Sequence, residues 1–134
     1  MLDNKTRIQT LLNAAVREME LIVRMAERVD IPSDFGSSMD GLIVFRACGM
    51  SLQYVTESFV KIRNLCGKDF FNSYKSIPWE AVFGMRNFLS HEYEEVDAEG
   101  IFNTVKTNIP DLLRVSRGIL KDLEIGELDS FLAD

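Results

Sequence analysis

The sequence predicts an all-α, up-and-down bundle of four to six helices, and three observations support this. Apolar residues recur at alternating steps of three and four over long stretches, which is the spacing of a helix face packed against another helix. Turn-forming residues separate these stretches, and no segment shows the alternation typical of a strand. With 134 residues, 46% of them hydrophobic, the chain is long enough to bury one core. We therefore expect a single domain over residues 1–134.

The first long helix should begin near the start of the sequence, where Asp3 or Asn4 can cap it, and end before Pro32. The residues from Pro32 to Ser38 have the turn composition of a connection between two helices. The apolar face of this first helix consists of Ile8, Leu12, Ala15, Met19, Ile22, Ala26 and Val29.

A second long helix is predicted from Met39 to Asn64, with Gly67 placed to end it. Its apolar stripe consists of Leu42, Phe45, Gly49, Leu52, Val55, Phe59 and Ile62. A short helical stretch should follow, from Lys68 to Tyr74.

Pro78 and Glu80 indicate the start of a third helix, because proline suits the first helical position and glutamate suits the first turn. Asp97 is placed to cap the helix after it, which Pro110 should bend or divide near Asn108. Residues 127–134 should form a loosely docked turn. The residues expected to face inward are Val82, Phe83, Met85, Phe88 and Leu89 in the third helix, and Leu112, Leu113, Ile119 and Leu120 in the last.

Composition excludes several classes of protein. A net charge of −6 and a pI near 4.8 argue against a protein that coats nucleic acid by bulk electrostatics. The segment from Tyr54 to Lys75 is nevertheless basic, which leaves room for a local basic groove.

No apolar run approaches the ~18 residues that span a bilayer, and no signal peptide precedes the first helix, so we expect a cytoplasmic protein. Cys48 and Cys66 form no metal-binding pattern, so we expect two reduced, buried thiols and no cofactor.

The chemistry of the chain is concentrated in one short segment, where Arg86, His91 and Tyr93 lie within eight positions and His91 is the only histidine. An arginine can hold a phosphate, a histidine can transfer a proton near neutral pH, and a tyrosine offers a hydroxyl for modification. On a regular helix Arg86 and Tyr93 share a face, while His91 lies about 140° from Arg86.

The three side chains therefore cannot converge well on one regular helix, and two arrangements could resolve this. The helix could end or distort around Ser90–His91, or a second copy of the chain could complete the site. Metal-free RNA cleavage needs a base, an acid and a cation for the charge on phosphorus. A dimer would supply two histidines for the acid and the base.

Other interpretations of the segment stay open. A lone histidine at a helix end is often a capping or surface residue, and spacing alone favours that structural role. The chain lacks HExxH, GxGxxG, P-loop and GxSxG motifs. The acidic residues from Glu92 to Glu99 match no metal-binding loop, so a solvated acidic turn is the better interpretation and no metal is expected.

A wider pattern surrounds the three residues: Ile77-Pro78-Trp79-Glu80, Gly84-Met85-Arg86-Asn87, His91-Glu92-Tyr93, Val96-Asp97 and Ile109-Pro110-Asp111-Leu112. It resembles the HepT-like branch of the HEPN proteins, whose hallmark is arginine, four residues, histidine, one residue, tyrosine. Asn87 fills the polar position that often follows the arginine. Many relatives carry Gly-Glu-Ala in the second helix, where this chain has Gly49-Met50-Ser51.

The resemblance implies a homodimeric helical bundle that acts as a metal-independent endoribonuclease toxin in a type II/VII-like toxin–antitoxin pair. It implies Arg86 as the phosphate-binding group, His91 as the acid–base group and Asn87 as a supporting residue. Its partner would be a nucleotidyltransferase antitoxin that transfers AMP onto Tyr93 and silences the ribonuclease. The rival expectation is a non-catalytic dimeric module that docks the nucleotidyltransferase and helps present its substrate.

Overall fold

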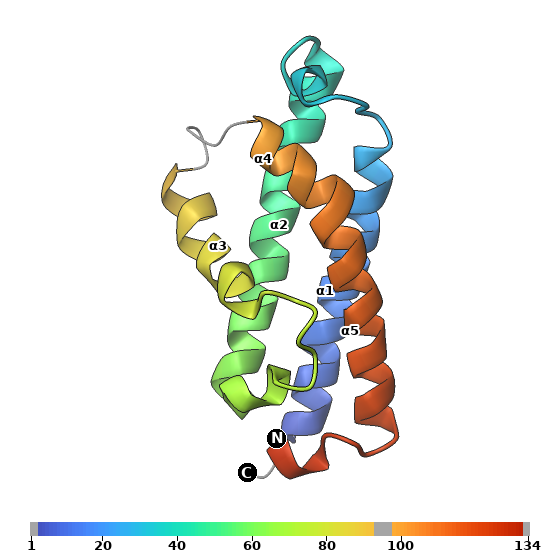
Figure 1. The fold of residues 1–134 in the computed structure, drawn as a ribbon, viewed down its shortest axis with the longest axis vertical. Coiled ribbons are helices and arrows are strands. Elements are labelled where there is room, and N and C mark those ends of the chain that lie inside the picture. The colour runs from blue at the N-terminus through green and yellow to red at the C-terminus, as the bar shows by residue number, and fades with distance from the viewer. Residues whose placement is uncertain (1–2, 93–97, 133–134) are drawn as a thin grey trace.

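The computed structural model describes residues 3–92 and 98–132, with the backbone alone for residues 86–92. Over these residues the fold is all α, without strands, which confirms the predicted class. The helices are α1 (Asn4–Ala26), α2 (Met39–Cys66), α3 (Trp79–Glu92), α4 (Ala98–Asn103) and α5 (Ile109–Glu124). In Figure 1, α1, α2 and α5 run side by side, and α3 lies on the far side of α2 from α1. Within the described part, no helix is long and apolar enough to cross a membrane.

Helix α1 begins where its sequence predicts and ends at Ala26, before the predicted Val29. The backbone N–H of Thr6 donates to Oδ1 of Asp3 at 2.8 Å, so Asp3 is the cap. At the other end, Nζ of Lys106 donates to the backbone carbonyl of Ala26 at 2.6 Å and so satisfies one of the free acceptors at the helix terminus. All but the last residue of the predicted face lie in α1; Val29 is buried just beyond it.

Helix α2 shows where the predicted stripe was wrong. Its first core contacts come from Val44 and Cys48, which are 4% and 0% exposed, whereas Leu42 is 38% exposed. Phe45 is only partly buried, against the ring of Phe35 at 5.0 Å. The cause lies outside α2, because the side that faces the core depends on where α1 and the Pro32–Phe35 turn pack against it.

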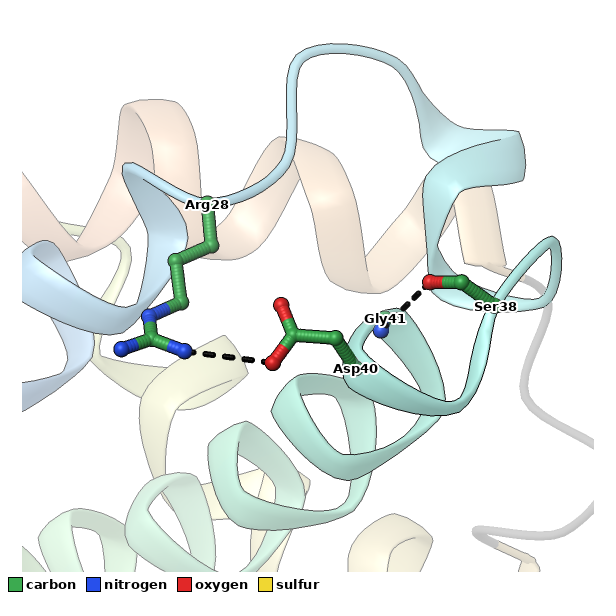
Figure 2. A network of polar contacts seen from close by, with 4 residues as sticks. All are labelled: Arg28, Ser38, Asp40 and Gly41. Carbon is green, nitrogen blue, oxygen red and sulfur yellow. Dashed lines mark hydrogen bonds and ion pairs between the residues drawn. The ribbon is translucent and has the colours of Figure 1, made fainter.

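The start of α2 is held close to the turn before it. Ser38 caps the helix and its Oγ accepts the backbone N–H of Gly41 at 3.0 Å (Figure 2). Glycine is required at position 41, since a Cβ there would collide with the backbone carbonyl of Asp34. At the other end Gly67 ends α2 with a φ of 85°, a conformation that favours glycine.

An aromatic cluster positions α3 against α2. The ring of Trp79 lies 5.5 Å from that of Phe59 and 4.4 Å from that of Phe71, and Phe83 lies 5.4 Å from Phe71. Arg63 places its guanidinium over the Phe83 ring at 4.5 Å. The predicted stretch after α2 is a 3₁₀ turn, Lys68–Phe71, and α3 begins at Trp79, one residue later than expected.

Pro110 changes the type of its helix without breaking it. Between α4 and α5 lies a π-helical turn, Thr104–Asn108, in which the N–H of Ile109 reaches back to the carbonyl of Thr104. Proline has no N–H for the usual bond to the carbonyl four residues back, and a widened turn accommodates its ring. The predicted division near Asn108 is therefore a change from π to α geometry within one rod. Asp97, the expected cap of α4, lies outside the described residues.

Two smaller features complete the core. After α5, Leu128 is 3% exposed, and the ring of Phe131 lies 6.1 Å from that of Phe70. The thiols of Cys48 and Cys66 are both free. Burial raises the pKa of Cys48 to about 11 and that of Cys66 to about 12, so both are protonated and unreactive at neutral pH.

The hydroxyl of Tyr74 should make the fold sensitive to alkali. It donates to Oδ2 of Asp122 at 2.7 Å. Burial is the main cause that raises the tyrosine pKa above its ordinary value near 10, and the carboxylate of Asp122 raises it further. As the pH rises, the unfolded chain therefore loses the Tyr74 proton before the folded chain does. The contribution of the Tyr74 hydroxyl to the free energy of unfolding is complete below about pH 10 and declines above it. Tyr74→Phe should flatten the decline measured by urea unfolding between pH 9 and 11. An unchanged slope would contradict the assignment.

Candidate functional site

Arg86, Asn87 and His91 all lie on the C-terminal half of α3, and Tyr93 lies outside the described residues. The helix is continuous from Trp79 to Glu92. The described part of α3 ends at Glu92, one residue past His91, so an end of the helix around Ser90–His91 stays a prediction. Along this backbone the positions of Arg86 and His91 keep the separation of about 140° around the axis that a regular helix gives them.

The register between α2 and α3 fixes where these positions lie along the bundle. The two helices run antiparallel, with Trp79 beside Phe59 and with Met85 and Leu52 lining the same groove. Arg86 and His91 follow in the last two turns of α3.

Two residues earlier on α3, Phe83 and Met85, show how the helix is rotated about its axis. Phe83 is buried toward α2, while Met85 lines a groove of about 380 Å³ between α2, α3 and the start of α5. At 100° per residue, position 91 lies about 120° around the helix axis from Met85 and about 80° from Phe83. Position 91 therefore lies on a different side of α3 from the groove.

The solvent-exposed face of α2 is apolar over its first four turns except at Arg46, and the predicted stripe of this helix did not include it. We define the outer face of α2 as Met39, Ile43, Arg46, Ala47, Met50 and Tyr54. Its large apolar members are 72% (Met39), 57% (Ile43), 77% (Met50) and 50% (Tyr54) exposed. These four recur at steps of four or seven, as core residues do. The signal was present in the sequence as a second stripe on the same helix.

The basic segment from Tyr54 to Lys75 does not gather into one groove. Arg63 stacks on Phe83 on the α3 side of α2, and Lys68 pairs with Glu80 at 4.0 Å. Lys61 instead lines a pocket with Arg7 on the side of α1. Among residues 3–92 and 98–132, no group of three His, Cys, Asp or Glu side chains could hold a metal ion.

Comparison with known proteins relates the chain to one family. The family described as "Ribonuclease HepT-like" matches residues 12–119, which include Arg86, Asn87, His91 and Tyr93. Two similar relatives from Methanocaldococcus jannaschii are named "Putative RNase". One is 28% identical over 120 residues, which is 90% of this chain and 97% of the relative. The other is 26% identical over 107 residues, or 78% of this chain and 85% of the relative.

A third relative, from Caldanaerobacter subterraneus subsp. tengcongensis, carries the same name. It is 27% identical over 110 residues, 82% of this chain and 91% of its own length. No solved structure gives a significant match.

Proposed function

This chain belongs to the HepT-like ribonuclease family, and on that premise we propose that it is a metal-independent endoribonuclease toxin of the cytoplasm, acting as one domain over residues 1–134. The observation that best supports the proposal is the helical backbone of α3 from Trp79 to Glu92, because a regular helix separates positions 86 and 91 by about 140° around its axis. In the proposal, a second protomer completes the site. RNA would then be cleaved in a cleft shared by the two protomers.

Each residue of the motif has a role set by its chemistry. The guanidinium of Arg86 holds the scissile phosphate and balances the charge that develops on it. His91 from one protomer accepts the proton of the 2′-hydroxyl, while His91 from the other donates a proton to the leaving oxygen. The amide of Asn87 supports the bound RNA by hydrogen bonding.

Regulation would come from a nucleotidyltransferase partner that transfers AMP onto Tyr93. The phenol of Tyr93 attacks the α-phosphorus of ATP, a bond to oxygen forms, and pyrophosphate leaves while the phenolic proton goes to solvent. The modified tyrosine then carries a nucleotide one or two turns from Arg86. In this scheme the pair forms a toxin–antitoxin system.

A cleavage assay in chelator tests the proposal. The purified protein should cut single-stranded RNA equally well with and without EDTA, because no step needs a divalent cation. Products should end in a 2′,3′-cyclic phosphate, since the neighbouring hydroxyl is the nucleophile. Loss of cleavage in EDTA would contradict metal independence. Absence of cleavage under every condition, together with binding to the nucleotidyltransferase, would favour the non-catalytic docking module instead.

A further inference from the structure

We infer that the groove between α2, α3 and the start of α5 holds a guanine base of the RNA substrate, close to the phosphate that Arg86 binds. Thr56, Asn108 and Asp111, which line this groove, supply the hydrogen bonds that recognise the base. RNA as the source of the base follows from the proposed function, on which this inference rests. The groove, its lining and an unpartnered hydroxyl on its floor are independent of that function.

Two segments that the sequence analysis singled out, and that the motif chemistry leaves unused, meet in this groove. Ile77 and Pro78 come from the segment that leads into α3, and Ile109, Asp111 and Leu112 come from the first turn of α5. In Figure 1, α2 lies between α3 and the rod formed by α4 and α5. Helix α2 therefore forms the floor of the groove, and the two segments form its walls.

The groove has the size and the lining of a small-ligand site. Its volume of about 380 Å³ lies near the lower end of the ~300–1,000 Å³ that ligand pockets occupy, which suits a single nucleoside. Leu52 and Val55 lie on the floor, with Val82 and Met85 on one wall and Leu112 on the other. Apolar side chains of this kind pack against the faces of a flat aromatic ring, and the thioether of methionine contacts such rings favourably.

A buried hydroxyl on the floor lacks a hydrogen-bond partner. Thr56 is 2% exposed and lines the groove. Its side chain makes no hydrogen bond within residues 3–92 and 98–132, whereas Oγ1 of Thr10 donates to the carbonyl of Thr6 at 2.9 Å. In that part of the chain, Ser116 has the only fully enclosed side-chain oxygen or nitrogen without a partner. The Thr56 oxygen is therefore accessible from the groove, where a bound base would satisfy it.

Polar groups from the opposite wall face the same space. Asn108 belongs to the π-helical turn, a distortion that is frequent at functional sites, and Asp111 to the first turn of α5. The side chain of Asp111 is 61% exposed, and its ion pair with Arg114 is long, at 3.8 Å. Asn108 makes no side-chain hydrogen bond to another described residue. A carboxylate and an amide are thus available to a ligand at the rim.

The carboxylate selects guanine among the four RNA bases. A carboxylate only accepts hydrogen bonds, so it binds best to an edge with two neighbouring N–H donors. Guanine presents N1–H and N2–H side by side, whereas adenine and cytosine present one donor next to an acceptor. Uracil presents one donor between two acceptors. With guanine at Asp111, the amide of Asn108 can donate to O6, and the hydroxyl of Thr56 to a ring nitrogen.

The groove leads along α3 to the motif. Val82 lines the groove, and position 86 follows it by four residues, which is one helical turn or about 6 Å further along the axis. Residues four apart are neighbours on the same side of a helix. A base in the groove and a phosphate at Arg86 are therefore close enough to belong to one nucleotide or to two adjacent ones.

Replacing one guanosine by inosine tests the inference, because inosine lacks only the amino group at N2. The probes are labelled 2′-O-methyl oligoadenosines with one central guanosine or inosine. They cannot be cleaved, since the 2′-oxygen is blocked, so binding is measured alone. In a fluorescence anisotropy titration the wild type should bind the guanosine probe about 10- to 100-fold more tightly, the range that a hydrogen bond to a charged group contributes.

Variants show whether the groove causes this preference. Asp111→Asn should lose it, whereas Asp129→Asn should keep it. Asp129 is a matched control, because its side chain is 64% exposed and forms a similarly long ion pair, at 3.7 Å to Lys5, outside the groove. Thr56→Val removes the hydroxyl with little change of shape, so it should weaken binding of both probes about fivefold. Circular dichroism should show an unchanged fold in all three.

The outcomes separate the groove from the function. Equal binding of the two probes by the wild type, or a preference that persists in Asp111→Asn, would overturn the inference. So would a calorimetric preference for free GMP over IMP that is absent with the RNA probes, since the groove would then serve a free nucleotide. A preference for the guanosine probe without cleavage of unmodified RNA would reject the ribonuclease alone. Cleavage of RNA without the preference would reject the base site alone.

Discussion

His91→Ala should lose RNA cleavage by about 10²–10⁴-fold, the range that general acid–base groups contribute. The effect should be large because each chain has a single histidine, so the variant dimer retains neither the base nor the acid. Cell toxicity should disappear with the activity. The measurement is the rate of cleavage of a labelled RNA at saturating protein, compared with the wild type across pH 5–9.

A control separates chemistry from folding. The midpoint of thermal unfolding should stay close to that of the wild type if His91 borders a solvent-filled cleft. An unfolded or strongly destabilised His91→Ala protein would favour the structural alternative, in which the histidine serves the fold. Arg86→Ala should also be inactive, and Arg86→Lys should be impaired because lysine lacks the planar pair of donors that grips a phosphate.

Mixed dimers test whether one cleft uses both histidines. After exchange between wild-type and His91→Ala protomers, a cleft that needs an acid and a base from different chains is active only in the wild-type pair. Activity should therefore fall as the square of the wild-type fraction. A linear fall would show that each protomer carries a complete site, contrary to the composite cleft.

Addition of AMP to Tyr93 should silence the enzyme as completely as removal of His91. The added nucleotide brings a negative charge close to Arg86, where it competes for the guanidinium that should hold the RNA phosphate. Its nucleoside would also occupy the cleft. Modification should consequently abolish RNA binding as well as cleavage, which a fluorescence anisotropy titration would detect.

Tyr93→Phe is the matched variant, since it removes only the acceptor hydroxyl. It should cleave RNA normally and escape silencing when incubated with the nucleotidyltransferase, ATP and magnesium. Intact-mass measurement should show the gain of an AMP group in the wild type alone. A gain that persists in Tyr93→Phe would exclude Tyr93 as the acceptor. A gain on Tyr93 that leaves RNA binding intact would reject the competition for Arg86.

The sequence by itself determined the class of fold and most helix ends, because these depend on local interactions. Asp3 caps α1, Gly67 ends α2 and Pro110 alters the helix that contains it. Each effect arises from hydrogen bonds or backbone angles within a few residues. The family was also evident from local residues, since the motif from Arg86 to Tyr93 and its flanking residues lie within one short stretch of chain.

Only the tertiary structure decided which side of each helix is buried. Two apolar stripes run along the first half of α2, and spacing cannot tell which faces the core. Helix α1 and the turn at Phe35 cover Val44 and Cys48, and Ile43 and Met50 are left in solvent. Burial is a property of what packs against a residue, and that partner comes from a distant part of the chain.

The candidate site also depends partly on local sequence and partly on tertiary packing. The residue types and their spacing indicated phosphate binding and proton transfer, whereas the direction in which α3 presents them depends on the aromatic contacts of Trp79 and Phe83 with α2. Those contacts bury Phe83 and leave Met85 on the wall of the groove. The rotation of a helix about its axis is fixed by long-range packing, so it could not be obtained from sequence spacing alone.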